Sequence, residues 1–252
     1  RLVGSEMCIR DRSTTAPSYV GSAATIDNKS DYEILAEQTV FIHVAVVAYP
    51  VKCEQKILRP DICEEILKQS LPIYDNSLGS GTYILHKGKI KVLSVEHLCG
   101  SNEPLTKIEY KGVTLTVKTE TTITVASKGL RANGQIEKVD AKKDLCLIKL
   151  DKQPSIILPE IAKKPLKRGD RVHYAGAPVG FASDTFTLSF EGSYSGTYGD
   201  DLIFSLPCKA GTSGSSIRNK DKKIVSIVQK VHTRWHYICF GAPLSSIKEF
   251  LK

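Results

Sequence analysis

Short runs of apolar and β-branched residues recur along almost the whole chain, separated by turns rich in glycine, lysine and polar residues. Such runs are typical of β-strands, and their close spacing favours an all-β sandwich or barrel over a helical fold. Strands are predicted at residues 39–47, 79–85, 90–95, 106–110, 112–118, 121–127, 144–150, 171–175, 184–191, 202–206, 223–231 and 236–240.

Helices are expected in only two places. The last residues, 243–252, place apolar side chains on one face after a proline, which predicts a short C-terminal helix. Residues 61–69 could form a second short helix inside the proline-containing stretch 49–78, which we interpret as an insertion.

The pattern divides the chain into two strand-rich halves. Residues 154–170 contain prolines and lysines without regular alternation, as a connector does. We therefore expect a first β-barrel over residues 38–153, and a second over 154–252 that includes the connector and the terminal helix. Ahead of them, residues 13–37 predict a loose tail. Residues 1–12, RLVGSEMCIRDR, resemble a translated sequencing adapter, so a natural N-terminal targeting segment could be missing and the localisation is left open.

Composition narrows the classes of function. The formal net charge is +8, but the lysines are scattered and aromatic residues are few, which argues against a nucleic-acid-binding barrel. No apolar run approaches the ~20 residues that a membrane-spanning helix needs. The cysteines form no CxxC pair, so a zinc ribbon is not expected.

The seven cysteines leave the redox compartment open. Cys53 and Cys63 flank a short loop and could pair in an oxidising compartment. The apolar settings of Cys146 and Cys239 favour buried free thiols. The sequence does not decide whether Cys53 and Cys63 pair.

The strongest chemical signal is the segment KAGTSGSS at residues 209–216. A serine between glycines on a tight turn presents its hydroxyl beside bare main-chain N–H groups, which can stabilise an oxygen that becomes negative during acyl transfer. A hydroxyl is a poor nucleophile near neutral pH. It needs a base within reach and a carboxylate that orients the base.

His97 and Asp144 are the candidates for these two roles. His97 stands where the predicted strand 90–95 meets a loop, a place that is rigid yet open to substrate. Asp144 opens the apolar run DLCLIKL, where a carboxylate is partly desolvated. Of the alternatives, His43 lies inside an apolar strand, and Asp140 is separated from the apolar run by two lysines. Each candidate alone also has a structural interpretation, so the combination carries the argument.

The three motifs, in the order His, Asp, Ser, resemble those of the trypsin/chymotrypsin-like serine proteases, especially the compact HtrA-like branch. SVEHLC resembles the histidine motif of that family, DLCLIKL its aspartate motif, and AGTSGSS its Gly-Asp/Asn-Ser-Gly-Gly motif. Further matching segments extend the resemblance from about residue 79 to the end of the chain. It implies an all-β fold of two antiparallel six-stranded β-barrels, the trypsin-like double barrel, with a short C-terminal helix.

The resemblance also implies roles for individual residues. Ser213 becomes the nucleophile, His97 the general base and Asp144 the orienting carboxylate. The main-chain N–H groups of Gly211 and Ser213 become the oxyanion hole.

Substrate contacts are implied in the same way. Pro207 and Lys209 are expected to wall the pocket for the residue before the cut bond, and the strand around Ser226 and Val228 to pair with the substrate backbone. Pro207 stands where trypsin carries an acid, so cleavage after Lys or Arg is not favoured.

Four departures from the family pattern stand out. Thr212 replaces the usual Asp or Asn, which argues against activation by N-terminal cleavage. Ser215 and Ser216 replace the usual Gly-Pro. Cys99 has no evident partner near residues 79–81, and the stretch 49–78 is not accounted for.

We therefore expect a serine endopeptidase that acts on polypeptide substrates without a cofactor or metal. The alternative is a catalytically silent, protease-like binding module. The residue preference at the cleavage site, the physiological substrate and the oligomeric state are not readable from this sequence.

Overall fold

The computed structural model describes residues 30–55, 60–69, 72–100, 107–110, 113–183, 186–232 and 234–252. The adapter-like start and most of the tail expected at 13–37 lie outside the described residues. The described part of the chain is mostly β, with 57% of its residues in strands. The predicted fold class is confirmed, because the described residues form a closed six-stranded antiparallel barrel, a second ring of strands and a short C-terminal helix.

The first barrel closes through pairing of its first and fifth strands. The strand order is β1-β2-β3-β7-β6-β5, with β5 pairing back onto β1 and β4 attached outside the ring. These strands are β1 (Thr39–Gln55), β2 (Ile73–His86), β3 (Lys89–Ser94), β4 (Lys107–Tyr110), β5 (Val113–Ser127), β6 (Leu130–Asp140) and β7 (Leu145–Leu150).

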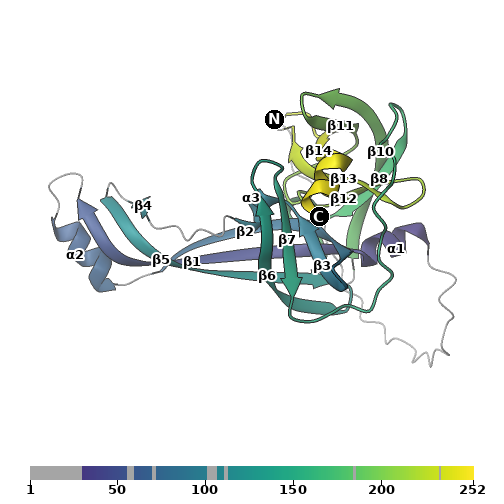
Figure 1. The fold of residues 1–252 in the computed structure, drawn as a ribbon. Helices are drawn as coiled ribbons and strands as arrows, with labels where there is room; N and C mark the ends of the chain where they lie inside the picture. The colour runs from purple at the N-terminus through teal and green to yellow at the C-terminus, as the bar shows by residue number, and fades with distance from the viewer. Residues whose placement is uncertain are drawn as a thin grey trace, which may run out of the picture.

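The second ring has the order β11-β14-β13-β12-β8-β10, and it is completed by the pairing of β10 with β11. Figure 1 shows it beside the first barrel, with the C-terminal helix α4 (Leu244–Phe250) returning between them. Its strands are β8 (Arg171–Gly176), β9 (Ala182–Ser183), β10 (Phe186–Tyr198), β11 (Asp201–Ser205), β12 (Ser216–Asn219), β13 (Ile224–Val231) and β14 (Ile238–Gly241).

Helices at both ends tie the two rings together. The apolar face of α4 places Ile247 and Phe250 in the core of the first barrel, although the helix follows the last strand of the second ring. Residues 31–37 correct the expectation of a loose tail, because they form helix α1 (Asp31–Glu37). Ser30 and Glu33 make a reciprocal capping box at its start.

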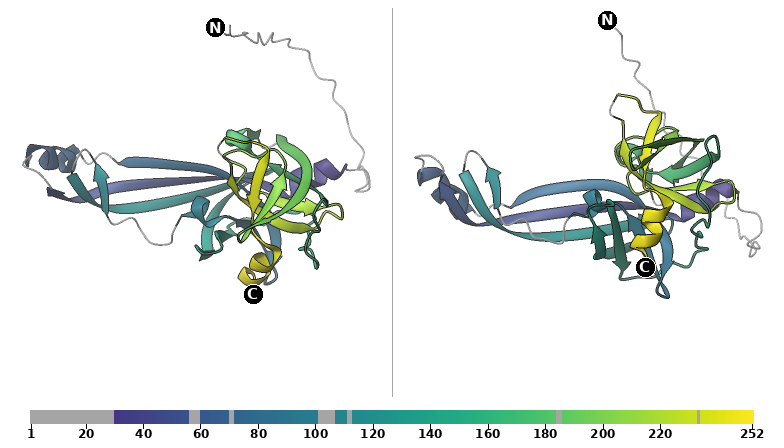
Figure 2. Two further views of the ribbon diagram at one scale, coloured as in Figure 1. Left: turned by 90° about the horizontal axis from the view of Figure 1, so that it is seen from above. Right: turned by 45° about the horizontal axis from the view of Figure 1, so that its top comes forward.

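The stretch interpreted as an insertion is a long β-arm. β1 runs on to Gln55 and β2 begins at Ile73, so both strands extend, with the first half of β5, far beyond the barrel (Figures 1 and 2). The helix expected at 61–69 is confirmed as α2 (Pro60–Gln69), at the far end of the arm. A separate small core packs there, formed by Ala48, Cys63, Leu115 and Val117.

The six cysteines in the described part of the chain form three disulfides: Cys53–Cys63, Cys99–Cys146 and Cys208–Cys239. The expectation of buried free thiols at Cys146 and Cys239 is therefore wrong, and Cys99 does have a partner. Pairing across 47 and 31 residues depends on strand neighbours that the linear sequence does not reveal.

Candidate active site

A single helical turn after β3 presents His97. The helix α3 (Glu96–Cys99) buries Leu98 and Cys99, and this leaves the His97 side chain 48% exposed. Leu98 packs so closely against Gly79 in β2 that a Cβ at residue 79 would lie 2.3 Å from it. Glycine at this position therefore allows the turn to sit directly on the barrel.

The Asp144 carboxylate accepts hydrogen bonds from two groups of His97, its main-chain N–H and its ring. The His97 main-chain N–H donates to Asp144 Oδ1 at 3.0 Å, and the ring Nδ1 lies 2.9 Å from Oδ2. Because Nδ1 faces a carboxylate, we assign its proton to that nitrogen, which leaves Nε2 of the neutral ring as an acceptor. Asp144 has a φ of +47° on the turn before β7, a conformation that aspartate tolerates better than most residues.

The pKa of the Asp144 carboxyl lies below its ordinary value of 3.8. Partial burial is the largest single influence and raises this pKa, but the hydrogen bonds from the ring and main chain of His97 together outweigh it. The carboxylate is therefore ionised throughout the neutral range, where it can stabilise an imidazolium.

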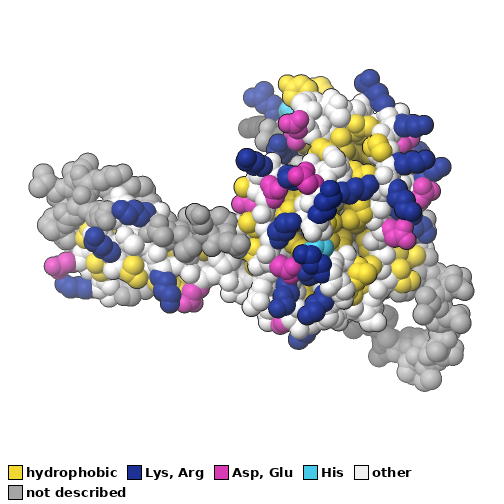
Figure 3. Space-filling view, viewed as in Figure 1, with side chains coloured by type: hydrophobic (Ala, Val, Ile, Leu, Met, Phe, Trp, Pro, Cys, Tyr) yellow, Lys and Arg dark blue, Asp and Glu magenta, His cyan; other side chains and the backbone are white. Residues whose placement is uncertain are grey.

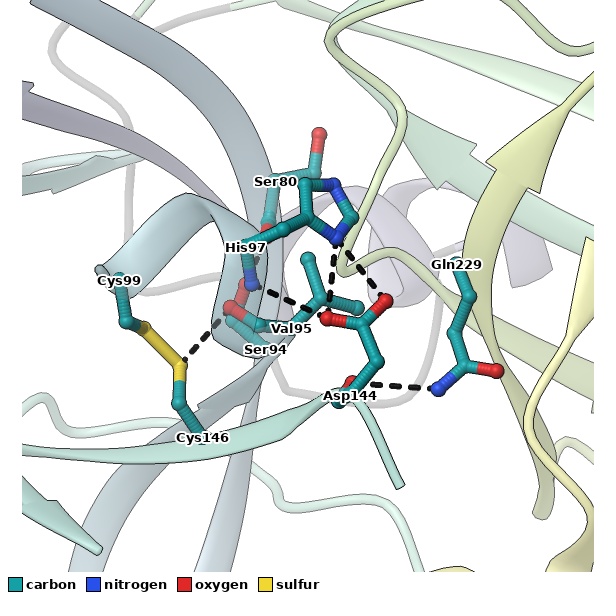
Figure 4. The surroundings of a disulfide bond; sticks show 8 residues. All are labelled: Ser80, Ser94, Val95, His97, Cys99, Asp144, Cys146 and Gln229. Atoms are coloured by element: carbon teal, nitrogen blue, oxygen red, sulfur yellow. Dashed lines mark hydrogen bonds and ion pairs between the residues drawn. A yellow bond between two sulfur atoms is a disulfide. The ribbon is translucent and has the colours of Figure 1, made fainter. Parts of the chain in front are cut away.

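The Cys99–Cys146 disulfide joins the two segments that carry this pair. Each cysteine lies two residues beyond its site residue, one after His97 in α3 and one after Asp144 in β7. Figure 4 shows the disulfide on one side of the His97–Asp144 contact and Gln229, from β13 of the second ring, on the other.

The serine turn connects β11 to β12 in the second ring. Gly211 and Gly214 both have positive φ values, +92° and +91°. A Cβ on Gly214 would lie 1.9 Å from the carbonyl oxygen of Ser80, so only glycine fits between this turn and β2. The Ser80 N–H donates to the Ser213 carbonyl at 2.9 Å, which fixes the turn against the first barrel.

Gln229 links the serine to the His–Asp pair. Its side-chain Nε2 donates to the main-chain oxygens of Lys143 and Asp144. The Ser213 hydroxyl donates to the main-chain oxygen of Gln229 at 3.5 Å. Within the described residues Ser213 Oγ makes no hydrogen bond to His97. Catalytic hydrogen bonds are often long before substrate binds.

Two main-chain donors remain available beside the serine. The Thr212 N–H and hydroxyl both donate to the Lys209 carbonyl, at 3.0 and 2.7 Å. In contrast, the N–H groups of Gly211 and Ser213 donate to no acceptor among the described residues. Ser213 is half-buried, so its hydroxyl remains reachable from solvent.

The predicted pocket residues Pro207 and Lys209 lie along an apolar cavity of about 350 Å³. Tyr174 forms part of its wall and donates to the Pro207 carbonyl at 2.6 Å. Burial raises the pKa of Tyr174 well above its ordinary value, so this hydroxyl keeps its proton and acts as a donor.

The structure corrects the expected substrate strand. Ser226 and Val228 are fully buried, the Ser226 hydroxyl donates to Ala242, and the Val228 main chain is bonded to Gly214 and Ser215. These two residues therefore cannot contact a substrate. The edge of β13 that faced β12 is unpaired from Gln229 onward, where β14 is its one partner strand among the described residues. Gln229 itself is buried, and the first exposed side chain of this stretch is Lys230.

Two further absences concern the described part of the chain alone. It contains no group of three or more His, Cys, Asp or Glu side chains placed to hold a metal ion. It also contains no helix with the length and apolar character required to cross a bilayer.

Comparison with known proteins gives a structural likeness only. No family model and no curated protein matches the sequence. Among solved structures, the fold resembles that of the serine endoprotease from Yersinia pestis, with a TM-score of 0.57 and 17% sequence identity. The alignment covers 88% of this chain and 66% of that chain. The chain therefore shares with that protein a fold of two packed rings of antiparallel strands.

Proposed function

We propose that this protein is a serine endopeptidase. The observation that carries the proposal is the His97–Asp144 hydrogen bond, which lies next to a turn that offers a reachable serine hydroxyl and two unused N–H groups. The resemblance of the three motifs leads us to propose the HtrA-like branch of the fold.

The reaction follows from these groups. Ser213 Oγ attacks the carbonyl carbon of the scissile peptide, while Nε2 of His97 accepts the hydroxyl proton and Asp144 stabilises the imidazolium. The carbonyl oxygen becomes negative and accepts hydrogen bonds from the N–H groups of Gly211 and Ser213. His97 then protonates the leaving amine, and a water molecule, deprotonated by the same ring, hydrolyses the ester on Ser213.

The substrate backbone pairs with the free edge of β13 from Gln229 to Val231, which places the cut bond beside Ser213. No acidic residue of the described chain lines the cavity beside Pro207 and Lys209, so this cavity does not favour Lys or Arg before the cut bond.

A digested peptide library tests the activity. The protein should cleave peptides, and Ser213→Ala should abolish cleavage while the circular dichroism spectrum stays unchanged. Ser195→Ala, in strand β10, provides the matched serine control and should cleave as the parent does. A folded parent protein that binds peptides without cutting any of them would instead identify the protease-like binding module.

Nucleic-acid binding has less support. On the face shown in Figure 3, basic and acidic side chains are interspersed over the barrels and form no continuous basic field.

A further inference from the structure

Four large apolar side chains stand exposed beside the serine turn. They come from β2, from the short 3₁₀ turn η2 (Pro178–Gly180) and the residue after it, and from the start of β10. Their exposed fractions are 46%, 72%, 61% and 48%. We call them the leaving-side patch, which consists of Leu78, Val179, Phe181 and Phe186.

Two packing contacts connect parts of the patch. The rings of Phe181 and Phe186 pack edge to face with centroids 5.7 Å apart. The Leu78 side chain lies against Gly180, where a Cβ would come within 3.2 Å of it. Side chains from both rings of strands therefore contribute to one apolar surface.

The conformation of Val179 gives the patch an unusual feature. Its φ is +48°, a left-handed value that β-branched residues rarely adopt. The chain thus holds a valine in a disfavoured conformation while exposing most of its side chain to water. Such local strain concentrates at functional sites.

The patch is directly connected to the proposed oxyanion turn. The Val179 N–H donates to the carbonyl of Ala210, and the N–H groups of residues 179 and 180 lie against Gly211. Two residues after Leu78, Ser80 donates its hydroxyl to the Gly211 carbonyl at 2.8 Å and its N–H to Ser213.

The position of the patch beside the serine turn indicates which part of a substrate would cover it. A substrate paired with Gln229–Val231 reaches Ser213 from the β13 side, because the Gln229 carbonyl lies beside the Ser213 hydroxyl. Beyond the cut bond the substrate must leave on another side of the serine turn. The patch borders that turn through Ser80 and Ala210, on elements other than β13.

We propose that the leaving-side patch binds apolar side chains in the first residues after the cut bond, so that this protein selects its substrates on the leaving side. The proposal rests on the proposed endopeptidase function. Exclusion of water from four apolar side chains supplies the preference, and the preformed turn at Val179 holds them in place.

Paired peptides test the proposal. Each pair carries the same sequence up to a cleavage site found in the library and differs only in leucine or serine at the first or second residue after it. The parent protein should give a kcat/KM about tenfold higher for leucine, the size of effect that a modest apolar contact provides. Val179→Asn and Phe181→Ser should bring this ratio close to one. The ratio does not depend on how much of each variant is active.

Tyr198→Ser is the matched control, because Tyr198 is 77% exposed but lies at the far end of β10. It should leave the ratio unchanged. A parent protein that cleaves peptides with no leucine preference would overturn the leaving-side proposal alone, as would a preference that survives both patch variants. A third result would also overturn it: the parent shows no leucine preference, and light scattering shows a dimer that dissociates in the patch variants but not in the Tyr198→Ser control. A second copy of the chain would then be what covers the patch. A folded parent that cleaves nothing would overturn both proposals together.

Discussion

At the scale of single residues, the role proposed for Asp144 has the most direct structural support, because Asp144 binds both the ring and the main chain of His97. Replacement by asparagine keeps the size and shape of the side chain. However, its amide nitrogen can donate to Nδ1, and this would favour the ring form whose Nε2 carries the proton and cannot accept one from Ser213.

Asp144→Asn should therefore lower kcat on a peptide substrate by about 10⁴-fold. Steady-state kinetics on the purified variant measures this, with Asp140→Asn as the control from the same turn. A loss smaller than about tenfold would argue that Asp144 does not orient the base.

The same carboxylate links stability to pH. Its pKa is lowered in the folded protein, so the stabilisation is fully present above the ordinary value of 3.8 and is lost as the pH falls through the lower folded value. Urea unfolding of the parent and of Asp144→Asn should differ at pH 6 and converge on acidification below about pH 4. A difference that stays constant down to pH 2 would contradict the assigned hydrogen bonds.

At the scale of elements, two disulfides are expected to differ in their importance for activity, although both contribute to stability. The Cys99–Cys146 bond holds α3 against β7 at the site, whereas Cys53–Cys63 fastens α2 to β1 in the arm. The loops they close span 47 and 10 residues.

Replacing both cysteines of each pair by serine should lower the free energy of unfolding by about 4 kcal/mol for the site disulfide and about 3 kcal/mol for the arm disulfide. The site variant should also lose activity at temperatures where it is still folded, because His97 is no longer held beside Asp144. The arm variant should keep its activity. Denaturant titration with parallel peptide assays makes the comparison, and equal activity in the two variants would exclude a positioning role for Cys99–Cys146.

The elements also show where prediction from sequence ends. The strand pattern, the three motifs and the helix at 61–69 were accessible because each depends on local residue order. The disulfide partners and the accessible edge of β13 were not, because they depend on pairing between distant strands. Val228 and Gln229 are adjacent in sequence, yet the first is bonded to the serine turn and the second borders the site. The helix α1 could have been found from Ser30 and Glu33, which match the capping-box spacing.

At the scale of the whole molecule, a buried cation ties the rings together. Arg218 in β12 is 1% exposed, and its guanidinium contacts the side chains of Gln38, Thr82 and Ser216. Desolvation lowers its pKa to about 9. Gln38 also donates to the Ile157 carbonyl, so it joins the first barrel, the connector and the second ring.

Gln38→Leu would remove the Gln38 acceptor from a buried charge and should destabilise the fold by about 3 kcal/mol. Urea unfolding measures the change, and Lys128→Ala, which breaks an exposed ion pair with Glu37, should change stability by less than about 1 kcal/mol. Similar small effects from both variants would show that Arg218 does not depend on Gln38.

The central claim is that the fold brings an imidazole, a carboxylate and a hydroxyl together so that one serine becomes reactive. Reaction with a fluorophosphonate, followed by peptide mapping in a mass spectrometer, tests it most directly. We predict a single adduct on Ser213 that is lost in His97→Ala while Ser213 is still present. Labelling of several serines at similar rates, or of Ser213 equally well without His97, would contradict the account.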